Sequence, residues 1–175
     1  MATEQYISEL CHIELASRTG KRQMRYVKKS NLPSGKHLGD LDFTAIEGFN
    51  KARMYKLVDN QDWIRQGANL LLFGASGVGK THLASSLGYS LIEAGTRVKF
   101  YSASALVQQL QEAKQSLKLQ DALNKLDKYP ALIIDDIGYV KKTEQETNVL
   151  FELIAHRYER HSLIITSNQS FEDWD

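Results

Sequence analysis

The sequence predicts an α/β fold in which helices cover both faces of a parallel sheet. Three observations support this prediction. Short apolar runs of strand length, at Asn69–Phe73, Ala131–Ile134 and Ser162–Thr166, alternate with longer stretches of helical periodicity. A glycine-rich turn follows the first run and leads directly into a helix-forming stretch. Polar residues follow the later runs, where open α/β sheets place their ligands.

Length and composition allow one such domain together with an additional arm. The chain has 175 residues, of which 42% are hydrophobic and 25% are charged, and this is an ordinary globular composition. The formal net charge is only +1, so the overall charge does not demand a nucleic-acid partner. Any such partner has to be inferred from local clusters of charge.

The single cysteine, Cys11, excludes an internal disulfide framework and a paired-cysteine metal site, and it fits a reducing compartment. A small apolar residue on a helix is a better interpretation of Cys11 than a nucleophile. No charged-then-apolar signal segment opens the sequence, and no apolar run is long enough to span a bilayer. We therefore expect a cytoplasmic protein without a membrane partner.

Residues 74–81 match the G-x-x-x-x-G-K-[ST] phosphate loop between a strand and a helix. Its glycines let backbone N–H groups approach phosphate oxygens, and the positive end of the following helix favours the same anion. Lys80 is expected to reach the β- and γ-phosphates of ATP, and the Thr81 hydroxyl is expected to ligate Mg²⁺. The expected nucleotide contacts are Gly74, Ala75, Ser76, Gly77, Val78, Gly79, Lys80, Thr81 and His82. A glycine turn without a ligand is the alternative, and the agreement of spacing, Lys-Thr pair and flanking elements weakens it.

Residues 4–30 are predicted to form a helical arm. Apolar or small residues recur at alternating spacings of four and three, which places them on one stripe: Tyr6, Leu10, Ile13, Ser17, Gly20, Met24 and Val27. Six cations lie beside the stripe at helical spacing, namely Arg18, Lys21, Arg22, Arg25, Lys28 and Lys29. Residues 15–39 contain no acid, so these cations favour contact with a phosphate backbone. A solvated helix face is the alternative.

Pro33 and Gly35 mark a linker over residues 31–40, so we divide the chain into an arm (1–30), this linker and a nucleotide-binding domain (41–175). Segments ahead of a phosphate-loop strand often hold the base. Phe43 and Ile46 are therefore possible adenine contacts, although ordinary core packing is the favoured interpretation of both.

Apolar periodicity and cap residues predict the elements around the phosphate loop. One helix is expected from about Asn50 to Ile64, and another from Lys80 to about Glu93, where Gly95 would end it. The alternating segment Arg97–Tyr101 predicts a second strand.

Further helices are expected in the second half of the chain. Ser102 or Ser104 can cap the next helix, and a more polar helical piece runs from Lys114 to Lys128. The lysines of this piece, Lys114, Lys118, Lys125 and Lys128, favour a solvated helix over a nucleic-acid surface. Thr143 and Glu146 form a capping box that opens another helix.

Two adjacent carboxylates, Asp135 and Asp136, end the strand that begins at Ala131. With a phosphate loop upstream, Asp135 is expected to hold Mg²⁺ through its water shell, and Asp136 to orient or deprotonate the attacking water. The alternative is a helix cap or an acidic turn. Glutamate is the commoner base, and aspartate is one methylene shorter, so hydrolysis is expected to be slow.

Asn168 follows the last strand and is expected to lie beside Asp135 and the γ-phosphate, where its amide can hold the water. A turn-forming asparagine is an equal alternative. Arg157 and Arg160 precede that strand, at the opposite end from the chain's own nucleotide. Either one could reach a nucleotide on a neighbouring subunit as an arginine finger, and surface cations are the alternative.

The segments GASGVGKTHLA, LIIDDIGY, LFELIAHRYER and LIITSNQSFEDW, in that order, resemble the AAA+ ATPases of the IstB/DnaC-like group. The resemblance is strongest to IstB-type helper ATPases of insertion-sequence transposition, and it covers about Leu32 to the end. It implies that Asn168 is the sensor-1 residue and that Arg157 or Arg160 is the finger. It also implies homo-oligomers that assemble on duplex DNA with ATP and hand a target site to a transposase.

Proteins of this group continue into a fifth strand and a small helical part with a sensor-2 arginine, whereas this chain stops at Asp175. The resemblance therefore implies a P-loop AAA+ core that lacks the small helical part and leaves the strand at Leu70–Phe73 as a sheet edge.

The expected function is ATP binding and hydrolysis with Mg²⁺, coupled to DNA binding as a transposition helper. A DnaC-like helicase loader is the first alternative. It would need an amino-terminal module that binds its partner protein. A small-molecule phosphotransferase would need an arginine-rich lid, which the sequence lacks. A fragment that binds ATP without hydrolysing it is the third alternative.

Overall fold

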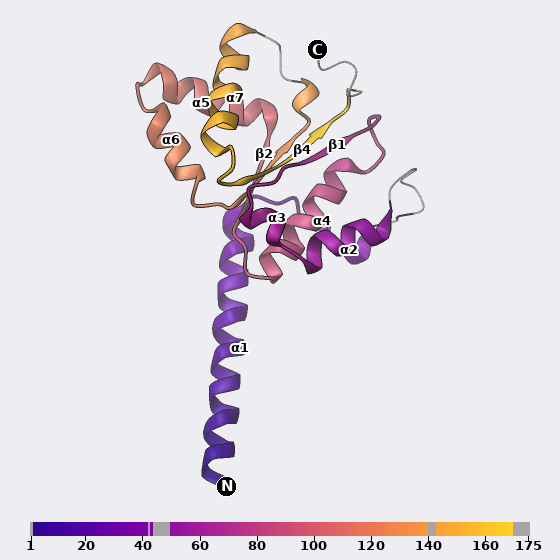
Figure 1. Cartoon of the computed structure of the whole chain (residues 1–175), viewed down its shortest axis with the longest axis vertical. Coiled ribbons are helices and arrows are strands. Elements are labelled where there is room, and N and C mark those ends of the chain that lie inside the picture. The colour runs from indigo at the N-terminus through magenta and orange to yellow at the C-terminus, as the bar shows by residue number, and fades with distance from the viewer. Residues whose placement is uncertain (1, 42, 44–49, 140–142, 170–175) are drawn as a thin grey trace.

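The protein is described by a computed structural model that covers residues 2–41, 43, 50–139 and 143–169 (Figure 1). Its centre is a parallel four-stranded sheet with the strand order β1-β4-β3-β2. The strands are β1 (Leu70–Phe73), β2 (Val98–Ser102), β3 (Ala131–Asp135) and β4 (Ser162–Ser167). The predicted α/β class with a parallel sheet is confirmed.

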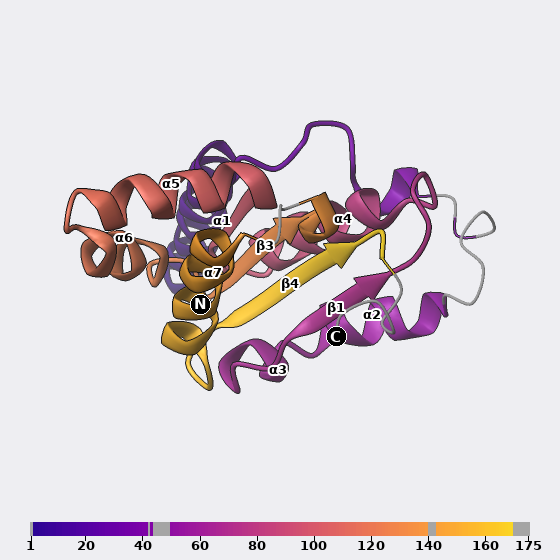
Figure 2. The ribbon, with the colours of Figure 1, turned by 90° about the horizontal axis from the view of Figure 1, so that it is seen from above.

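Helices cover both faces of the sheet (Figure 2). One layer contains α5 (Ala103–Gln115), α6 (Leu119–Leu126) and α7 (Glu144–Arg157). The other contains α2 (Lys51–Asp59), α3 (Asp62–Arg65), α4 (Lys80–Glu93) and the end of α1 (Ala2–Ser30). Short 3₁₀ turns occur at Leu38–Asp40 and Ile137–Tyr139.

The central strand β3 divides the core into two halves, because successive side chains of a strand point to opposite faces. Leu132 and Ile134 pack with the α5–α7 layer, and Ile133 packs with the α2–α4 layer. All five residues of β3 are buried, as the uninterrupted apolar run predicts for a strand covered on both sides. The position of Asp135 at the end of this strand is therefore fixed by both halves of the core.

Helix boundaries agree with the sequence where a cap is present. Helix α4 has the predicted bounds, and Gly95 follows it with φ of +94°, a conformation that glycine adopts without strain. Thr143 and Glu146 form the predicted capping box of α7, and Ser102 caps α5.

The single helix predicted from Asn50 to Ile64 is wrong, because the segment forms two helices. Asn50 caps α2, and the Asn60 side chain accepts a hydrogen bond of 2.8 Å from the backbone N–H of Asp62, which starts α3. Asn60, the residue at which α2 ends, therefore divides the predicted helix.

Helix α1 runs through Gly20 without a break and projects from the core (Figure 1). Residues 4–18 are exposed, and so are the apolar side chains of the predicted stripe from Tyr6 to Ile13. The carboxyl end of the helix contacts the core through a neighbouring face. Gln23 Nε2 donates to the carbonyl of Glu93 at 2.6 Å, and Lys99 Nζ donates to the carbonyl of Lys29 at 2.9 Å.

The predicted linker lies along α4. Tyr89 Oη donates to the carbonyl of Pro33 at 3.1 Å, and Ser86 Oγ donates to the carbonyl of Lys36 at 3.2 Å. The hydrogen bonds of α4 therefore hold the connection between the arm and the core.

Strand β1 lies at the edge of the sheet, where, among the residues described, it pairs only with β4. This position agrees with the edge that the sequence predicts. None of the helices in the described part of the chain is both long and apolar enough to cross a bilayer.

Gly67 allows α3 and β1 to approach the turn between α7 and β4, and this contact yields a stability prediction. Its φ is +66°, and a Cβ there would lie 2.8 Å from the carbonyl carbon of Glu159 and 2.9 Å from the nitrogen of Arg160. Gly35 has a similar φ of +71°, but no described atom would lie within 4 Å of its Cβ. We expect Gly67→Ala to lower the free energy of unfolding by about 2–4 kcal/mol, and Gly35→Ala by about 1 kcal/mol. Urea denaturation measures both, and equal losses would contradict the close approach.

Candidate nucleotide-binding site

The phosphate loop connects β1 to α4 in a conformation that requires glycine. Gly77 and Gly79 have φ of +85° and +93°, and Gly79 is the residue from which α4 begins. Residues with a Cβ are strained at these angles, so the glycines of the motif are explained by the turn itself. Free N–H groups at the start of α4 point toward the loop and give it a positive potential.

Lys80 lies across this loop. Its ammonium group donates hydrogen bonds of 2.7 Å to the carbonyl of Gly74 and 2.7 Å to the carbonyl of Ala75. These bonds hold a positive charge beside the loop backbone and the first turn of α4. A concave loop with a fixed ammonium and a helix N-terminus suits a phosphate group, and the donor set therefore fits ATP.

Thr81 and Asp135 meet at the carboxyl end of β3. The Thr81 hydroxyl lies 2.9 and 3.0 Å from the two carboxylate oxygens of Asp135, which is 9% exposed. The two residues predicted to hold Mg²⁺ are thus brought together from positions 54 residues apart. A hydroxyl and a carboxylate are oxygen donors of the kind that Mg²⁺ prefers, so the residues present fit this ion.

Thr166 is a third member of this cluster that sequence reasoning missed. Its hydroxyl donates to Asp135 Oδ1 at 2.7 Å and accepts a hydrogen bond of 2.8 Å from the backbone N–H of Asp136. The pairing of Ile134 with Ile165 places Thr166 beside Asp135. Thr166 could have been identified only from the parallel register of β3 and β4. In the sequence alone, a β-branched residue in a strand indicates only strand propensity.

Asp136 adopts a left-handed conformation with φ of +61°, which aspartate tolerates better than most residues do. The hydrogen bond from its N–H to Thr166 supports this conformation. The side chain is half-buried. The turn at this residue sends the chain into the 3₁₀ turn at Ile137–Tyr139.

Asn168, which the sequence predicts beside Asp135 and the γ-phosphate, lies against this turn. Its Oδ1 atom is buried and, within the described part of the chain, has no hydrogen-bond partner. The atom lies against Gly138, and a Cβ at position 138 would overlap it. Gly138 is thus required for the position of Asn168, a role that a lone glycine after Asp-Asp-Ile does not reveal in the sequence.

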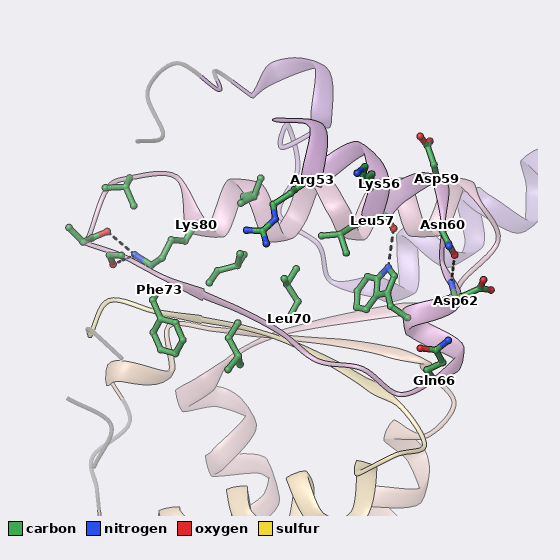
Figure 3. Close-up of a pocket in the computed structure, with 17 residues that line it drawn as sticks. Arg53, Lys56, Leu57, Asp59, Asn60, Asp62, Gln66, Leu70, Phe73 and Lys80 are labelled. Atoms are coloured by element: carbon green, nitrogen blue, oxygen red, sulfur yellow. Dashed lines mark hydrogen bonds between the residues drawn. The ribbon is translucent and has the colours of Figure 1, made fainter. Parts of the chain in front are cut away.

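A cavity of about 1350 Å³ extends along β1 from the phosphate loop to α3 (Figure 3). Gly74 and Lys80 line one end, and Trp63 lines the other, where its indole N–H donates to the carbonyl of Leu57 at 3.0 Å. The guanidinium group of Arg53, from α2, points into the space between them. Sequence reasoning missed Arg53 because its inward direction depends on how α2 packs over β1.

The two residues suggested as adenine contacts have different outcomes. Phe43 packs against the hydrophobic cluster of the α2–α4 layer, and the Lys51 ammonium lies 5.1 Å from its ring centre. This agrees with the alternative of core packing. Ile46 lies outside the described residues. His82, expected at the nucleotide, has its Nε2 atom 3.3 Å from the carbonyl of His37.

The prediction that Arg157 could act as an arginine finger is corrected by its burial. The side chain is 1% exposed. It donates hydrogen bonds to four carbonyl oxygens, those of Leu126, Tyr129, Pro130 and Ser162. Burial lowers the pKa of Arg157 to about 10, and the Asp127 carboxylate, 3.7 Å away, opposes this shift. Arg157 is therefore a structural cation that joins three segments, whereas Arg160 is exposed and remains a candidate finger.

Five of the six arm cations predicted to contact DNA are exposed and have no ion-pair partner among the described residues: Lys21, Arg22, Arg25, Lys28 and Lys29. The sixth, Arg18, forms an ion pair of 2.6 Å with Glu14 one turn earlier. The arm meets the core near the start of β2. This is the opposite end of the sheet from the phosphate loop.

Comparison with known proteins agrees with an ATP-binding site at the phosphate loop. A family model described as IstB-like ATP binding protein matches residues 1–175. An insertion sequence ATP-binding protein of Sinorhizobium fredii is 45% identical over 97% of this chain, which spans 57% of that protein's length.

Among solved structures, the AMPPCP-bound DnaA of Aquifex aeolicus matches with a TM-score of 0.70 and 20% identity, over 83% of this chain and 46% of that one. A DnaC helicase loader matches with a TM-score of 0.57 and 25% identity, over 74% of this chain and 79% of the other. These structures show the P-loop AAA+ fold.

The contrast between the two arginines yields a second stability prediction. Arg157→Met removes a buried cation and leaves four carbonyl oxygens and Asp127 without it, so the free energy of unfolding should fall by about 3–5 kcal/mol. Arg160→Met removes an exposed cation and should change this free energy by about 0.5 kcal/mol or less. Chemical denaturation of both variants tests the assignment. A loss at Arg160 as large as the loss at Arg157 would contradict it.

Proposed function

The chain belongs to the family of IstB-like ATP binding proteins, and we propose that it is a magnesium-dependent ATPase that binds duplex DNA and assists the transposase of an insertion sequence. One observation carries the proposal most directly. Lys80 and Thr81 begin α4, and the Thr81 hydroxyl contacts Asp135 at the end of the central strand. This pairing of a phosphate-binding loop with a buried carboxylate is what a nucleoside triphosphatase requires.

ATP binding would use the loop and the cavity beside β1. The loop N–H groups and the Lys80 ammonium would hold the phosphates. The cavity between the loop and Trp63 leads away from the phosphates and would receive the nucleoside, with Arg53 directed into it. Its volume of about 1350 Å³ is large enough for a nucleoside.

Thr81 and Asp135 would hold Mg²⁺, directly or through its water shell. Within the described part of the chain no group of three His, Cys, Asp or Glu side chains could hold a metal alone. Mg²⁺ is usually held by one or two carboxylates together with the phosphates of the substrate. When bound, Mg²⁺ would neutralise charge on the β- and γ-phosphates. Thr166 would keep the Asp135 carboxylate turned toward Thr81.

For hydrolysis, Asp136 would orient or deprotonate water, and Asn168 would position it. Asn168 Oδ1 is a buried amide oxygen without a described partner, and such an atom could accept a hydrogen bond from the water. The exposed Arg160 would act on the nucleotide of a neighbouring subunit in a homo-oligomer. Duplex DNA would lie against the basic face of α1.

A helicase loader is the second candidate, because a DnaC helicase loader matches the fold over 74% of this chain. The insertion-sequence relatives favour transposition, since the Sinorhizobium protein matches over 97% of this chain with 45% identity. A pull-down with a transposase against a replicative helicase separates the two candidates.

Lys80→Ala should abolish ATP-dependent binding of duplex DNA, because it removes the cation that reaches the β- and γ-phosphates. Filter binding with and without ATP measures this effect. Lys118→Ala, at an exposed residue just before α6, is the matched control and should bind as the wild type does. ATP-stimulated binding that persists in Lys80→Ala would count against the proposal.

Gly138→Ala should reduce ATP hydrolysis about tenfold to a hundredfold while ATP binding is retained, because the added Cβ displaces Asn168. The control is Gly39→Ala. Gly39 also lies in the middle of a 3₁₀ turn, and no described atom would lie within 4 Å of its Cβ. Phosphate release and nucleotide titration measure the two properties. Unchanged hydrolysis in Gly138→Ala would exclude the proposed role of Asn168.

A further inference from the structure

A second cavity, of about 210 Å³, lies where the arm meets the core. Three segments that are far apart in the sequence form it: the last turns of α1, the start of β2, and the residues before β3. Its lining includes four cations, Arg25, Lys29, Arg97 and Lys128, and two tyrosines, Tyr26 and Tyr129. No acidic side chain from the described part of the chain lines it. We refer to these six residues as the arm–core notch.

The cations of the notch have no acidic partner. Among the described residues none of the four forms an ion pair. The nearest acid in the sequence, Asp127, precedes Lys128 but is engaged elsewhere. It accepts a hydrogen bond of 2.8 Å from His156 and lies 3.7 Å from Arg157 and His161. The notch therefore gathers positive charge that the fold leaves uncompensated, and such a concave site attracts anions.

A fifth cation fixes the geometry of the notch. Lys99 Nζ donates to the carbonyl of Lys29 at 2.9 Å and lies 5.9 Å from the ring centre of Tyr129. This ammonium joins the carboxyl end of α1 to β2, where the helix dipole is negative. The end of the arm is thus held against the core, and the notch is a formed site between them.

The basic face of the arm leads into the notch. Arg18, Arg22, Arg25 and Lys29 follow one another at spacings of four, three and four residues, so they form a single row on the helix. The row is about 16 Å long at 1.5 Å per residue. Arg97 and Lys128, on the core, line the notch together with Arg25 and Lys29 of this row.

We propose that the arm–core notch binds a phosphodiester group of a duplex DNA backbone, a proposal that rests on the proposed DNA-binding function. Arginine and lysine side chains on both sides of the notch would contact the phosphate, and arginine can do so through two parallel N–H donors. The cavity is too small for a base pair and suits a phosphate with its sugar. The contact is thus independent of base sequence and fixes the arm relative to the DNA.

The test neutralises only the core side of the notch. The double variant Arg97→Gln with Lys128→Gln removes two exposed cations and leaves the arm unchanged. We expect its affinity for duplex DNA to fall about tenfold at roughly 0.1 M salt, and the slope of log K against log salt to decrease by about 1–2. ATP binding should be unchanged, because the phosphate loop lies at the other end of the sheet.

The matched control is Lys118→Gln with Lys125→Gln, which removes the same charge from exposed positions, one just before α6 and one on it. It should keep nearly all of the DNA affinity. A charge-preserving pair, Arg97→Lys with Lys128→Arg, should keep the salt slope of the wild type and most of its affinity, because the number of cations at the notch is unchanged. If the neutral double variant binds no worse than the control, the notch is not a DNA contact. If the wild type binds no duplex DNA even with ATP, the proposed DNA-binding function itself is wrong. This outcome differs from a loss of the notch contact alone, in which the wild type and the neutral double variant bind DNA equally well.

Discussion

The site depends on one carboxylate, that of Asp135. Its oxygens accept hydrogen bonds from Thr81 on α4 and Thr166 on β4, so one side chain joins the phosphate-loop helix to two adjacent strands. Asp135 is 9% exposed, and a buried carboxylate needs such partners to remain favourable. The buried apolar residues of β3 fix the position of the Asp135 backbone, and the hydroxyls of Thr81 and Thr166 fix the orientation of its carboxylate. The placement of Asp136, Gly138 and Asn168 follows from that fixed point, since the turn begins beside it.

The two candidate sites lie at opposite ends of the sheet and are connected by α4. This helix begins at Lys80 in the phosphate loop, and ten consecutive residues from Leu83 to Ile92 are buried. At its other end the carbonyl of Glu93 accepts a hydrogen bond from Gln23 on the arm. Helix α4 is thus a largely buried element that contacts both the phosphate loop and the arm. A nucleotide at one end and DNA at the other would act on the same helix.

Much of the fold could be predicted from the sequence because its determinants are local. Apolar runs define β3 and β4, and Gly79 and Gly95 delimit α4. The rest depends on contacts that local patterns do not contain. Arg157 resembles a surface cation at the end of a helix until residues 126–130 and Ser162 supply its acceptors. Thr166 and the arm–core notch likewise require the parallel register and the packing of the arm.

The most direct test of the central claim is calorimetric titration of ATP into the protein with and without Mg²⁺, compared between the wild type and Asp135→Asn. Binding to the wild type should be enhanced by Mg²⁺, and Asp135→Asn should lose this enhancement while it keeps part of the metal-free affinity, because the loop and Lys80 remain. A wild type whose ATP binding is indifferent to Mg²⁺, or an Asp135→Asn variant with an undiminished Mg²⁺ effect, would contradict the account.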